Sequence, residues 1–425
     1  MNYKQKIEEA NQKALDIITT SQPYWVDVKP AIDVIPGMKK NLFLHAGPPI
    51  TWERMCSAQK KAVVGAAVFE GLADNLEDAY LMGDRGEIMI SSSHMHDSVG
   101  SMTGVTSASM PVLVIENRPI GNRAYINVHE GPSRNRLTYG AFDEQVKANL
   151  EWIRDILGPA LGRAVRDMGG MAITPLISKS LTMGDECHNR PTAGSALFAL
   201  KVIPIILESD LDHATLKKIF DFLIATEHFF FHFAMAAHKA ALDAASNIPY
   251  STVVTAMARN GIEVGIRVSA TGEEWFTGPA ATIEGVYFPG FGPEDAELDI
   301  GDSAICETAG LGAFAMAASI PMAQAVGRSA ADAIDFQESM IDITVGRHPA
   351  YQIPALDFLG TPCAIDIRKV VQTGLLPIID TAIAYKKGGE IGVGIARPPM
   401  ECFTKGLKRF GEIIMTIETE VSNAS

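Results

Sequence analysis

The alternation of apolar and polar residues predicts both helices and strands in the first third of the chain. Apolar residues at positions 7, 10, 14 and 17 follow helical spacing, which predicts an amphipathic helix at the N-terminus. Three prolines, Pro23, Pro30 and Pro36, are expected to interrupt the segment that follows. Short apolar runs bounded by Ser, Gly and Pro predict strands at residues 42–44, 88–90, 112–115 and 121–128.

The pattern changes twice more along the chain. Residues 142–250 carry helical stripes, and strand signals return from residue 251 onwards. Asn260-Gly261 lies between apolar runs and is typical of a hairpin turn. We therefore expect an α+β protein in which two mixed α/β domains, residues 1–141 and 251–425, flank an inserted or intervening all-helical domain, residues 142–250.

Composition narrows the class of protein. The chain has 425 residues, of which 47% are hydrophobic and 20% are charged, so it can bury a large core. The net charge of -14 argues against nucleic-acid binding and a basic membrane face, but it allows a local cationic pocket. The five cysteines are dispersed and form no CxxC pair, which favours a reducing cytoplasm. Residues 308–327 are uncharged, but their Ala and Gly content favours buried helices over a membrane span.

The first candidate site is the long polar loop between the strands predicted at 88–90 and 112–115. Small hydroxyl residues and glycines in such a loop can direct N–H and O–H donors at an anion. We expect phosphate binding here, next to His94, by Ser101, Thr103, Gly104, Thr106 and Ser107. A Gly/Ser-rich surface loop would have the same composition, and no GxxxxGK[ST] signature is present.

A second polar loop, residues 182–191, lies between predicted helices. Its charged side chains are Asp185, Glu186, His188 and Arg190. These residue types could ligate a metal or serve as acid, base and anion clamp, but they could equally cap two helix ends. Further along, His228 and His232 stand four residues apart on one helical face, where the surrounding Phe and Ala favour core or interface histidines over a metal pair.

Arginines near the later strands are candidates for gripping a carboxylate or phosphate in a bidentate manner. Together with neighbouring polar residues, this candidate set is Arg259, Asn260, Arg267, Asp302, Ser303 and Arg368. A solvated strand face could explain Arg267, and helix capping could explain Asp302 and Ser303. Residue chemistry thus indicates a small anionic ligand, but it does not define a reaction.

A series of sequence blocks occurs here in the order typical of one bacterial family. The blocks are HAGPP (45–49), VGSMTGVTSASMPVLVIEN (99–117), GNRAY (121–125), TMGDECH (182–188), TAMARNG (255–261), GIRVS (265–269), EEWFTGP (273–279), GDSAICET (301–308) and DIRKVVQTG (366–374). In these blocks the chain resembles the YlbE-like family, whose recognised role is as the AllG-type subunit of oxamate carbamoyltransferase. The resemblance departs at His129, where the family pattern has Asn, and at His228, His232 and His238, which lie outside the pattern.

The resemblance implies an enzyme subunit in anaerobic allantoin breakdown. That enzyme exchanges a carbamoyl group between oxalurate and phosphate, which gives oxamate and carbamoyl phosphate. It implies an FdrA-like subunit and a third subunit as partners, and two mixed α/β domains with a helical insertion as the fold. We expect no cofactor, no bound metal, a small anionic substrate and a possible homo-oligomer.

Carbamoyl transfer needs preorganised donors around two anions. In this hypothesis the Ser/Gly loop holds phosphate, and Arg259, Arg267 or Arg368 holds the oxamate carboxylate. The catalytic candidates are His94, Glu130, Asp185, Glu186 and His188. One histidine would donate to the carbonyl or shuttle a proton, with a carboxylate orienting it.

Three alternatives stay open. The chain could be a non-catalytic ligand-binding or scaffold subunit beside an FdrA-like protein. It could be a paralogue that acts on another small carboxylate. It could also be a metal-dependent hydrolase that uses Asp185, Glu186 and His188.

Overall fold

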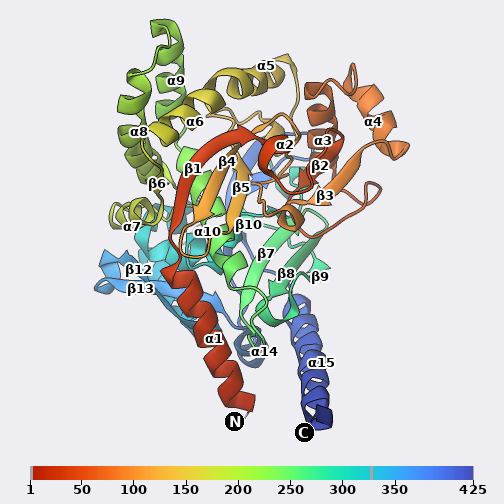
Figure 1. Ribbon diagram of the computed structural model, residues 1–425, viewed down its shortest axis with the longest axis vertical. Coiled ribbons are helices and arrows are strands. Elements are labelled where there is room, and N and C mark those ends of the chain that lie inside the picture. Colours follow the sequence, from red (N-terminus) through yellow and green to blue (C-terminus); the bar gives the residue numbers. More distant parts are fainter. Residues whose placement is uncertain (1–2, 326–328, 425) are drawn as a thin grey trace.

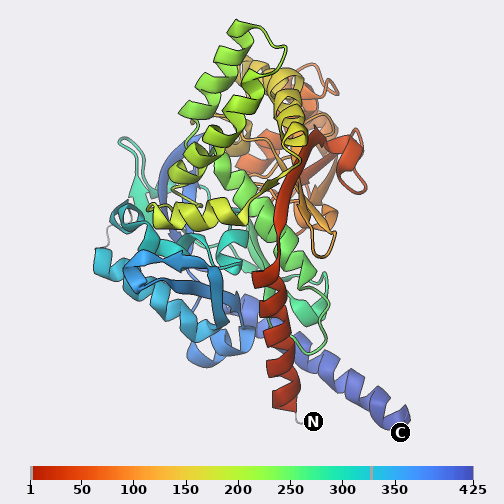
Figure 2. The same cartoon turned by 60° about the vertical axis from the view of Figure 1, so that its left-hand side comes forward.

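The computed structural model, which describes residues 3–325 and 329–424, has a mixed α+β fold, as predicted. Its strands form several small sheets. Helices α1 (Tyr3–Thr20) and α15 (Met400–Ala424) extend from one end of the molecule, and α8 (Thr192–Leu207) and α9 (His213–Ala225) lie at the opposite end (Figures 1 and 2).

The N-terminal strands form one antiparallel sheet and one parallel pair. The sheet has the order β5 (Arg123–Asn127), β4 (Pro111–Asn117), β1 (Pro23–Pro30) and β6 (Met171–Ala172). The parallel pair is β2 (Leu42–His45) and β3 (Met89–Ser92), connected through α3 (Ser57–Phe69) and α4 (Leu76–Asp84). The expectation that prolines interrupt residues 23–36 is wrong for β1, because Pro23 and Pro30 stand at its two ends, where a missing N–H is tolerated.

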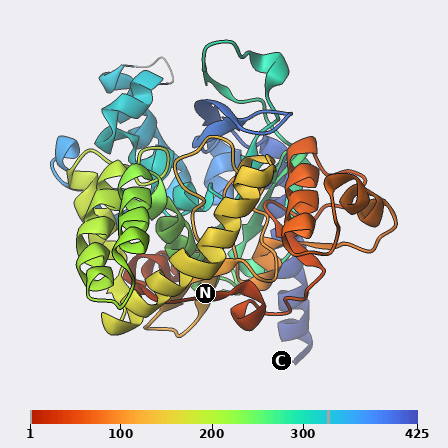
Figure 3. The same ribbon diagram turned by 90° about the horizontal axis from the view of Figure 1, so that it is seen from above.

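Residues 142–250 are largely helical, but the expectation of an all-helical segment is wrong at β6, which joins the N-terminal sheet beside β1. A helix of two parts, α5 (Glu144–Trp152) and α6 (Gly158–Asp167), is continuous through a π-helical segment at Ile153–Leu157. The remaining helices are α7 (Thr174–Thr182), α8, α9 and α10 (Phe229–Ala244). Figure 3 shows α8 and α9 on one side of the molecule and α3 on the other. Helix α10 is almost entirely buried, since it packs against β4, β5, α8 and α1.

The C-terminal part contains three further sheets, all antiparallel. The first has the order β11 (Ile300–Gly301), β7 (Val254–Asn260), β8 (Glu263–Val268) and β9 (Phe276–Pro279). The second is β10 (Glu284–Tyr287), β15 (Glu390–Ala396) and β14 (Ile379–Ala384), and the third is β12 (Thr344–Ile353) with β13 (Leu359–Ile365). The described α-helices here are α11 (Ile305–Thr308), α12 (Ile320–Ala325), α13 (Ala330–Ser339), α14 (Ile367–Thr373) and the C-terminal α15.

One apolar core connects these parts. The largest cluster of buried side chains runs from Ala10 to Ala364 and draws on all three predicted segments. The division at residues 141 and 250 stays a prediction. Among the described residues no single helix is long and apolar enough to cross a membrane. Helices α9 and α10 reach that length and apolar character only when they are taken together, and the pair is bent by 71°. Of the uncharged run at 308–327, Ala309–Ala317 is buried, whereas residues 326–327 lie outside the described part.

The core also holds neutral histidines, from which we predict acid sensitivity. Burial lowers the pKa of His232 to about 4 and the pKa values of His238 and His348 to about 3, from 6.5. Because these folded pKa values are depressed, the stabilisation is complete above pH 6.5 and is lost as the pH falls towards 4. Each histidine should cost about 1.4 kcal/mol of unfolding free energy at pH 5.5. Because the raised pKa values of His188 and Glu307 act with the opposite sign, this loss is measured as the difference between the protein and a histidine variant in urea unfolding at pH 7.5 and 5.5.

The matched variant for this prediction is His348→Phe, because His348 stacks on Tyr351 with ring centroids 3.6 Å apart and an aromatic ring can take its place. Its stability should differ less between the two pH values than that of the unchanged protein. An equal difference in both proteins would exclude His348 as a source of the acid sensitivity.

Candidate active site

The loop at residues 182–191 holds His188 in place through two buried carboxylates. Asp185 accepts hydrogen bonds from the backbone N–H groups of Cys187 (2.7 Å) and Gly194 (2.8 Å). Glu186 accepts from the backbone N–H groups of His188 (2.7 Å) and Arg190 (2.5 Å). Both carboxylates therefore shape the loop, and His188 is the side chain that the loop presents.

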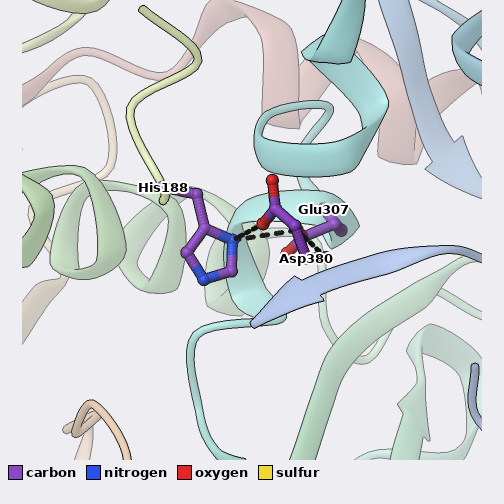
Figure 4. A group of neighbouring side chains, drawn as sticks. All are labelled: His188, Glu307 and Asp380. Atoms are coloured by element: carbon purple, nitrogen blue, oxygen red, sulfur yellow. Dashed lines mark hydrogen bonds and ion pairs between the residues drawn. The ribbon is translucent and has the colours of Figure 1, made fainter. Parts of the chain in front are cut away.

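His188 meets two carboxylates from distant parts of the chain. Its Nδ1 lies 2.5 Å from Oδ1 of Asp380, on β14, and 2.9 Å from Oε1 of Glu307, on α11 (Figure 4). All three side chains are buried, and the imidazole stacks on Phe231 with ring centroids 5.0 Å apart. In Figure 4 the second ring nitrogen of His188 points away from the carboxylates. The ring is thus fixed at one nitrogen, and the other is left for a ligand.

The electrostatics of this group favour a charged His188. Burial lowers the pKa of His188, but the charges and hydrogen bonds of Asp380 and Glu307 outweigh it and hold the pKa well above 6.5. Burial raises the pKa of Glu307 to about 7, against the opposing effect of His188. Burial also opposes ionisation of Asp380, yet His188 holds the pKa of that carboxyl below its ordinary value. The arrangement is an imidazolium held by a carboxylate and a second, titratable carboxyl group.

The same three residues are the group that could hold a metal ion. One ligand atom from each of His188, Glu307 and Asp380 lies within 4.8 Å of the others. Nδ1 donates a hydrogen bond to Glu307 at 2.9 Å, and its 2.5 Å contact with Asp380 is an ion pair. Ligands around a first-row metal ion stand about 3 Å or more apart, because each bond is about 2.1 Å long. The geometry therefore fits a proton better than a metal ion.

A small pocket adjoins His188. Its volume is about 50 Å³, and its polar lining residues include Ser101, Thr138, Ser303, His129, Arg136, His228 and Glu390. The Arg136 guanidinium donates to the carbonyl oxygen of Gly131 at 2.9 Å and lies 3.8 Å from a carboxylate oxygen of Glu390. Its Nε has no hydrogen-bond partner. A guanidinium, an imidazolium and several hydroxyls around one space form a pocket suited to a small anion.

A buried neutral histidine, His129, lines one wall of this pocket, and His232 packs against it. The ring of His129 lies 4.9 Å from that of His232, whose Nε2 is 3.0 Å from the hydroxyl oxygen of Ser101. Burial, followed by the nearby charge of Arg136, lowers the pKa of His129 well below its ordinary value. His129 therefore supplies a neutral imidazole to the wall, and the positive charge comes from Arg136 and His188.

A second cluster gathers three residues of the predicted set. His94, in the 3₁₀ turn Ser93–His96, has Nε2 3.5 Å from a carboxylate oxygen of Asp302. The Arg267 guanidinium lies over the ring of Trp275, 4.8 Å from its centroid, and the rings of Trp275 and His94 are 5.3 Å apart. Asp302 accepts hydrogen bonds from the backbone N–H groups of Gly47 and Gly100, so it ties the Ser/Gly loop to the segment after β2.

The remaining residues of the predicted set bond within the protein. Arg259 forms a bidentate pair with Asp299, and its Nη1 donates to the hydroxyl of Ser303. Arg368 pairs with Asp366. The other hydrogen bonds join Glu130 to the backbone of Leu137 and Thr138, Thr103 to Thr138, Thr106 to Asn127, Ser107 to Glu70, and Asn260 to Pro48. Gly104 has φ +67 and packs against Ala46.

Four residues of the two clusters are not among the site residues predicted from the sequence. They are Arg136, Glu307, Asp380 and Trp275. Glu307 was visible only as a carboxylate in the first turn of a predicted helix, where capping explains it. Asp380 gave the clearer signal, because it is a lone carboxylate in an apolar run, IIDTAIA, that forms a buried strand.

The fold and this pocket together define a mixed α+β protein with a buried imidazolium beside a small polar pocket, in which the Arg136 guanidinium is paired with Glu390. The family model described as "Oxamate carbamoyltransferase subunit AllG" matches residues 88–303. The chain is 42% identical over 411 residues to oxamate carbamoyltransferase subunit AllG of Escherichia coli K12. The aligned residues cover 96% of this chain and 98% of that protein. The chain therefore belongs to the AllG family, which confirms the resemblance.

Two other proteins are similar over almost the whole chain. The uncharacterised protein YahG of Escherichia coli K12 is 48% identical over 404 residues, which are 95% of this chain and 85% of YahG. A crystal structure of a conserved protein of unknown function from Enterococcus faecalis V583 has a TM-score of 0.95 and 45% identity, and covers 97% of this chain and 99% of that one.

Proposed function

We propose that this protein is a subunit of an oxamate carbamoyltransferase and that the pocket beside His188 is its reaction site. The reaction exchanges a carbamoyl group between oxalurate and phosphate, giving oxamate and carbamoyl phosphate. Membership of the AllG family supports the class of reaction. The observation that carries the assignment to this pocket is the His188 ring, held at Nδ1 by Asp380 and Glu307 beside a cationic, hydroxyl-lined space.

The chemistry assigns a role to each feature of the pocket. A phosphate oxygen attacks the carbamoyl carbon of oxalurate, a C–O bond forms, and the C–N bond to oxamate breaks. The leaving amide nitrogen needs a proton, which the second ring nitrogen of His188 donates, and the phosphate hydroxyl restores it. Arg136 and the hydroxyls of Ser101 and Ser303 stabilise the negative charge that develops on the attacked carbonyl oxygen.

The test is a carbamoyl phosphate consumption assay with oxamate. The protein is assayed alone and then with the FdrA-like subunit and the third subunit that we propose as its partners. Activity of the chain alone would indicate a complete site. Activity only in the mixture would indicate a composite enzyme, and no activity in a mixture that is shown to be assembled would reject the proposal. The same assay after EDTA treatment tests our proposal that neither cofactor nor metal takes part.

One observation favours a second candidate function. The identity to YahG, 48%, is higher than the identity to AllG, 42%. The protein could therefore be a paralogue that transfers a carbamoyl group to a different small carboxylate. Replacing oxamate by other amides and amino acids in the assay separates the two functions. A non-catalytic scaffold role has less support, because most of the described residues in the small-residue stretches at 234–245 and 309–325, which could have packed against a partner, lie buried in this chain.

The proposed acid role of His188 predicts a displaced pH profile in Asp380→Asn. Asp380 is the main group that raises the pKa of His188 against the effect of burial, so its replacement should lower that pKa. An acid must be protonated to act, so activity is lost as the pH rises above its pKa. The alkaline limb of the pH–rate profile should therefore move to lower pH in the variant. An alkaline limb at the same pH would remove His188 as the acid.

A further inference from the structure

Arg267 is a buried cation without a carboxylate partner among the described residues. Its exposed fraction is 6%, so the guanidinium has lost most of its contact with water. The two hydrogen bonds that it makes go to the thioether sulfur of Met95, at 2.8 Å, and to the backbone oxygen of His94, at 3.5 Å. The comparable arginines Arg259 and Arg368 both have a carboxylate within 3 Å. A buried charge with such weak partners is costly unless an anion binds to it.

The free edge of the Arg267 guanidinium has the shape that a carboxylate needs. Among the described residues its Nε has no hydrogen-bond partner, and its Nη2 donates to the Met95 sulfur, which is a weak acceptor. A planar carboxylate pairs side-on with Nε and Nη2 in a bidentate manner. Met95 is an unbranched side chain that is 42% exposed, so it can leave this edge without disturbing the core.

A second unpartnered donor belongs to the same cluster. Among the described residues the buried indole Nε1 of Trp275 has no hydrogen-bond partner. The Arg267 guanidinium lies over this indole ring, and the His94 ring meets it with an angle of 83° between the two planes. Buried N–H groups usually have partners, so the unpartnered Nε–H of Arg267 and Nε1–H of Trp275 indicate a missing acceptor.

We propose that Arg267 and Trp275, beside His94, form a binding site for a small carboxylate that displaces the Met95 sulfur. Neither of the two residues lines the pocket beside His188, so this is a second anion site. The two sites are joined through adjacent residues, because Ser101 and Ser303 line the pocket, whereas Gly100 and Asp302 bond to each other beside His94. The proposal needs no assumption about the reaction in the pocket.

The test measures oxamate binding to the full chain by calorimetry and by tryptophan fluorescence. In Arg267→Gln the affinity of this second site for oxamate should fall at least tenfold, so the variant should bind one oxamate fewer per chain than the unchanged protein. The matched control is Arg123→Gln, because Arg123 is also an arginine on a strand but its side chain is 51% exposed and pairs with Glu116. It should leave the affinity unchanged. Trp275→Phe should abolish the ligand-dependent fluorescence change and weaken the calorimetric signal.

Further variants separate this site from the pocket and from a folding defect. Arg267→Lys keeps the positive charge but cannot form two parallel hydrogen bonds to a carboxylate. It should therefore fold as the unchanged protein does but bind oxamate more weakly at this site. The same number of bound oxamate molecules per chain in Arg267→Gln and in the unchanged protein would overturn the proposal, because the pocket beside His188 would then account for all oxamate binding. Inorganic phosphate is the second probe. Arg267-dependent phosphate binding without oxamate binding would overturn the assignment of a carboxylate.

Discussion

Replacement of His188 by asparagine is expected to lower the rate of carbamoyl transfer by a factor of 10² to 10⁴, the usual contribution of a positioned acid or base. The amide nitrogen of asparagine can occupy the place of Nδ1 and keep the contacts with Asp380 and Glu307. It has no group at the place of the second ring nitrogen. The loop and the buried carboxylates should therefore stay in place while the proton donor is lost.

Steady-state kinetics of the assembled enzyme measure this effect. The loss should appear in kcat more than in KM, because the proton moves only in the transition state. His213→Asn is the matched control, since His213 is exposed at the first position of α9, and its rate should be unchanged. A loss of less than threefold in His188→Asn, with a normal thermal transition, would place the chemistry on another residue or on a partner subunit.

The sequence identified His188 but not its partners, and the reason is the distance along the chain. The loop at residues 182–191 is polar and lies between apolar helices, so its residues were visible as candidates. Glu307 is 119 residues further along, and only the packing of α11 and β14 against this loop brings Glu307 and Asp380 to the ring. Local patterns carry no information on such long-range contacts. They also cannot distinguish a carboxylate that binds backbone N–H groups, as Glu186 does, from one that binds a ligand.

The fold shows the same division between local and long-range information. Apolar runs with clear boundaries predicted β4, β5, β7 and β8, because their side chains alone determine the pattern. β15 was not predicted, because glycines at 392 and 394 hide its strand character. A Cβ atom at either position would lie 2.5 Å from a backbone oxygen of β10, so the close pairing of these strands requires glycine. That requirement is a property of the neighbouring strand, and it is absent from the local sequence.

The second large effect is expected on stability, in Arg259→Met. Arg259 is fully buried and donates from Nε and Nη2 to both carboxylate oxygens of Asp299, at 2.9 Å and 3.0 Å, and from Nη1 to the backbone oxygen of Gly301 at 2.6 Å. Methionine preserves much of the volume but leaves the charge of Asp299 uncompensated in the core. Breaking a buried ion pair in this way typically costs about 3–5 kcal/mol of unfolding free energy.

Urea unfolding of three variants separates the cost of the unpaired charge from the loss of packing. The double variant Arg259→Met with Asp299→Leu removes both charges, so it should be more stable than Arg259→Met alone. Arg123→Met, at an exposed arginine, should change stability by less than about 0.5 kcal/mol. A loss below about 1 kcal/mol in Arg259→Met would show that Asp299 finds another partner or becomes protonated. Arg267 has no carboxylate partner among the described residues, so Arg267→Gln should lower the free energy of unfolding much less than Arg259→Met. This comparison distinguishes an arginine that stabilises the fold from one that binds a ligand.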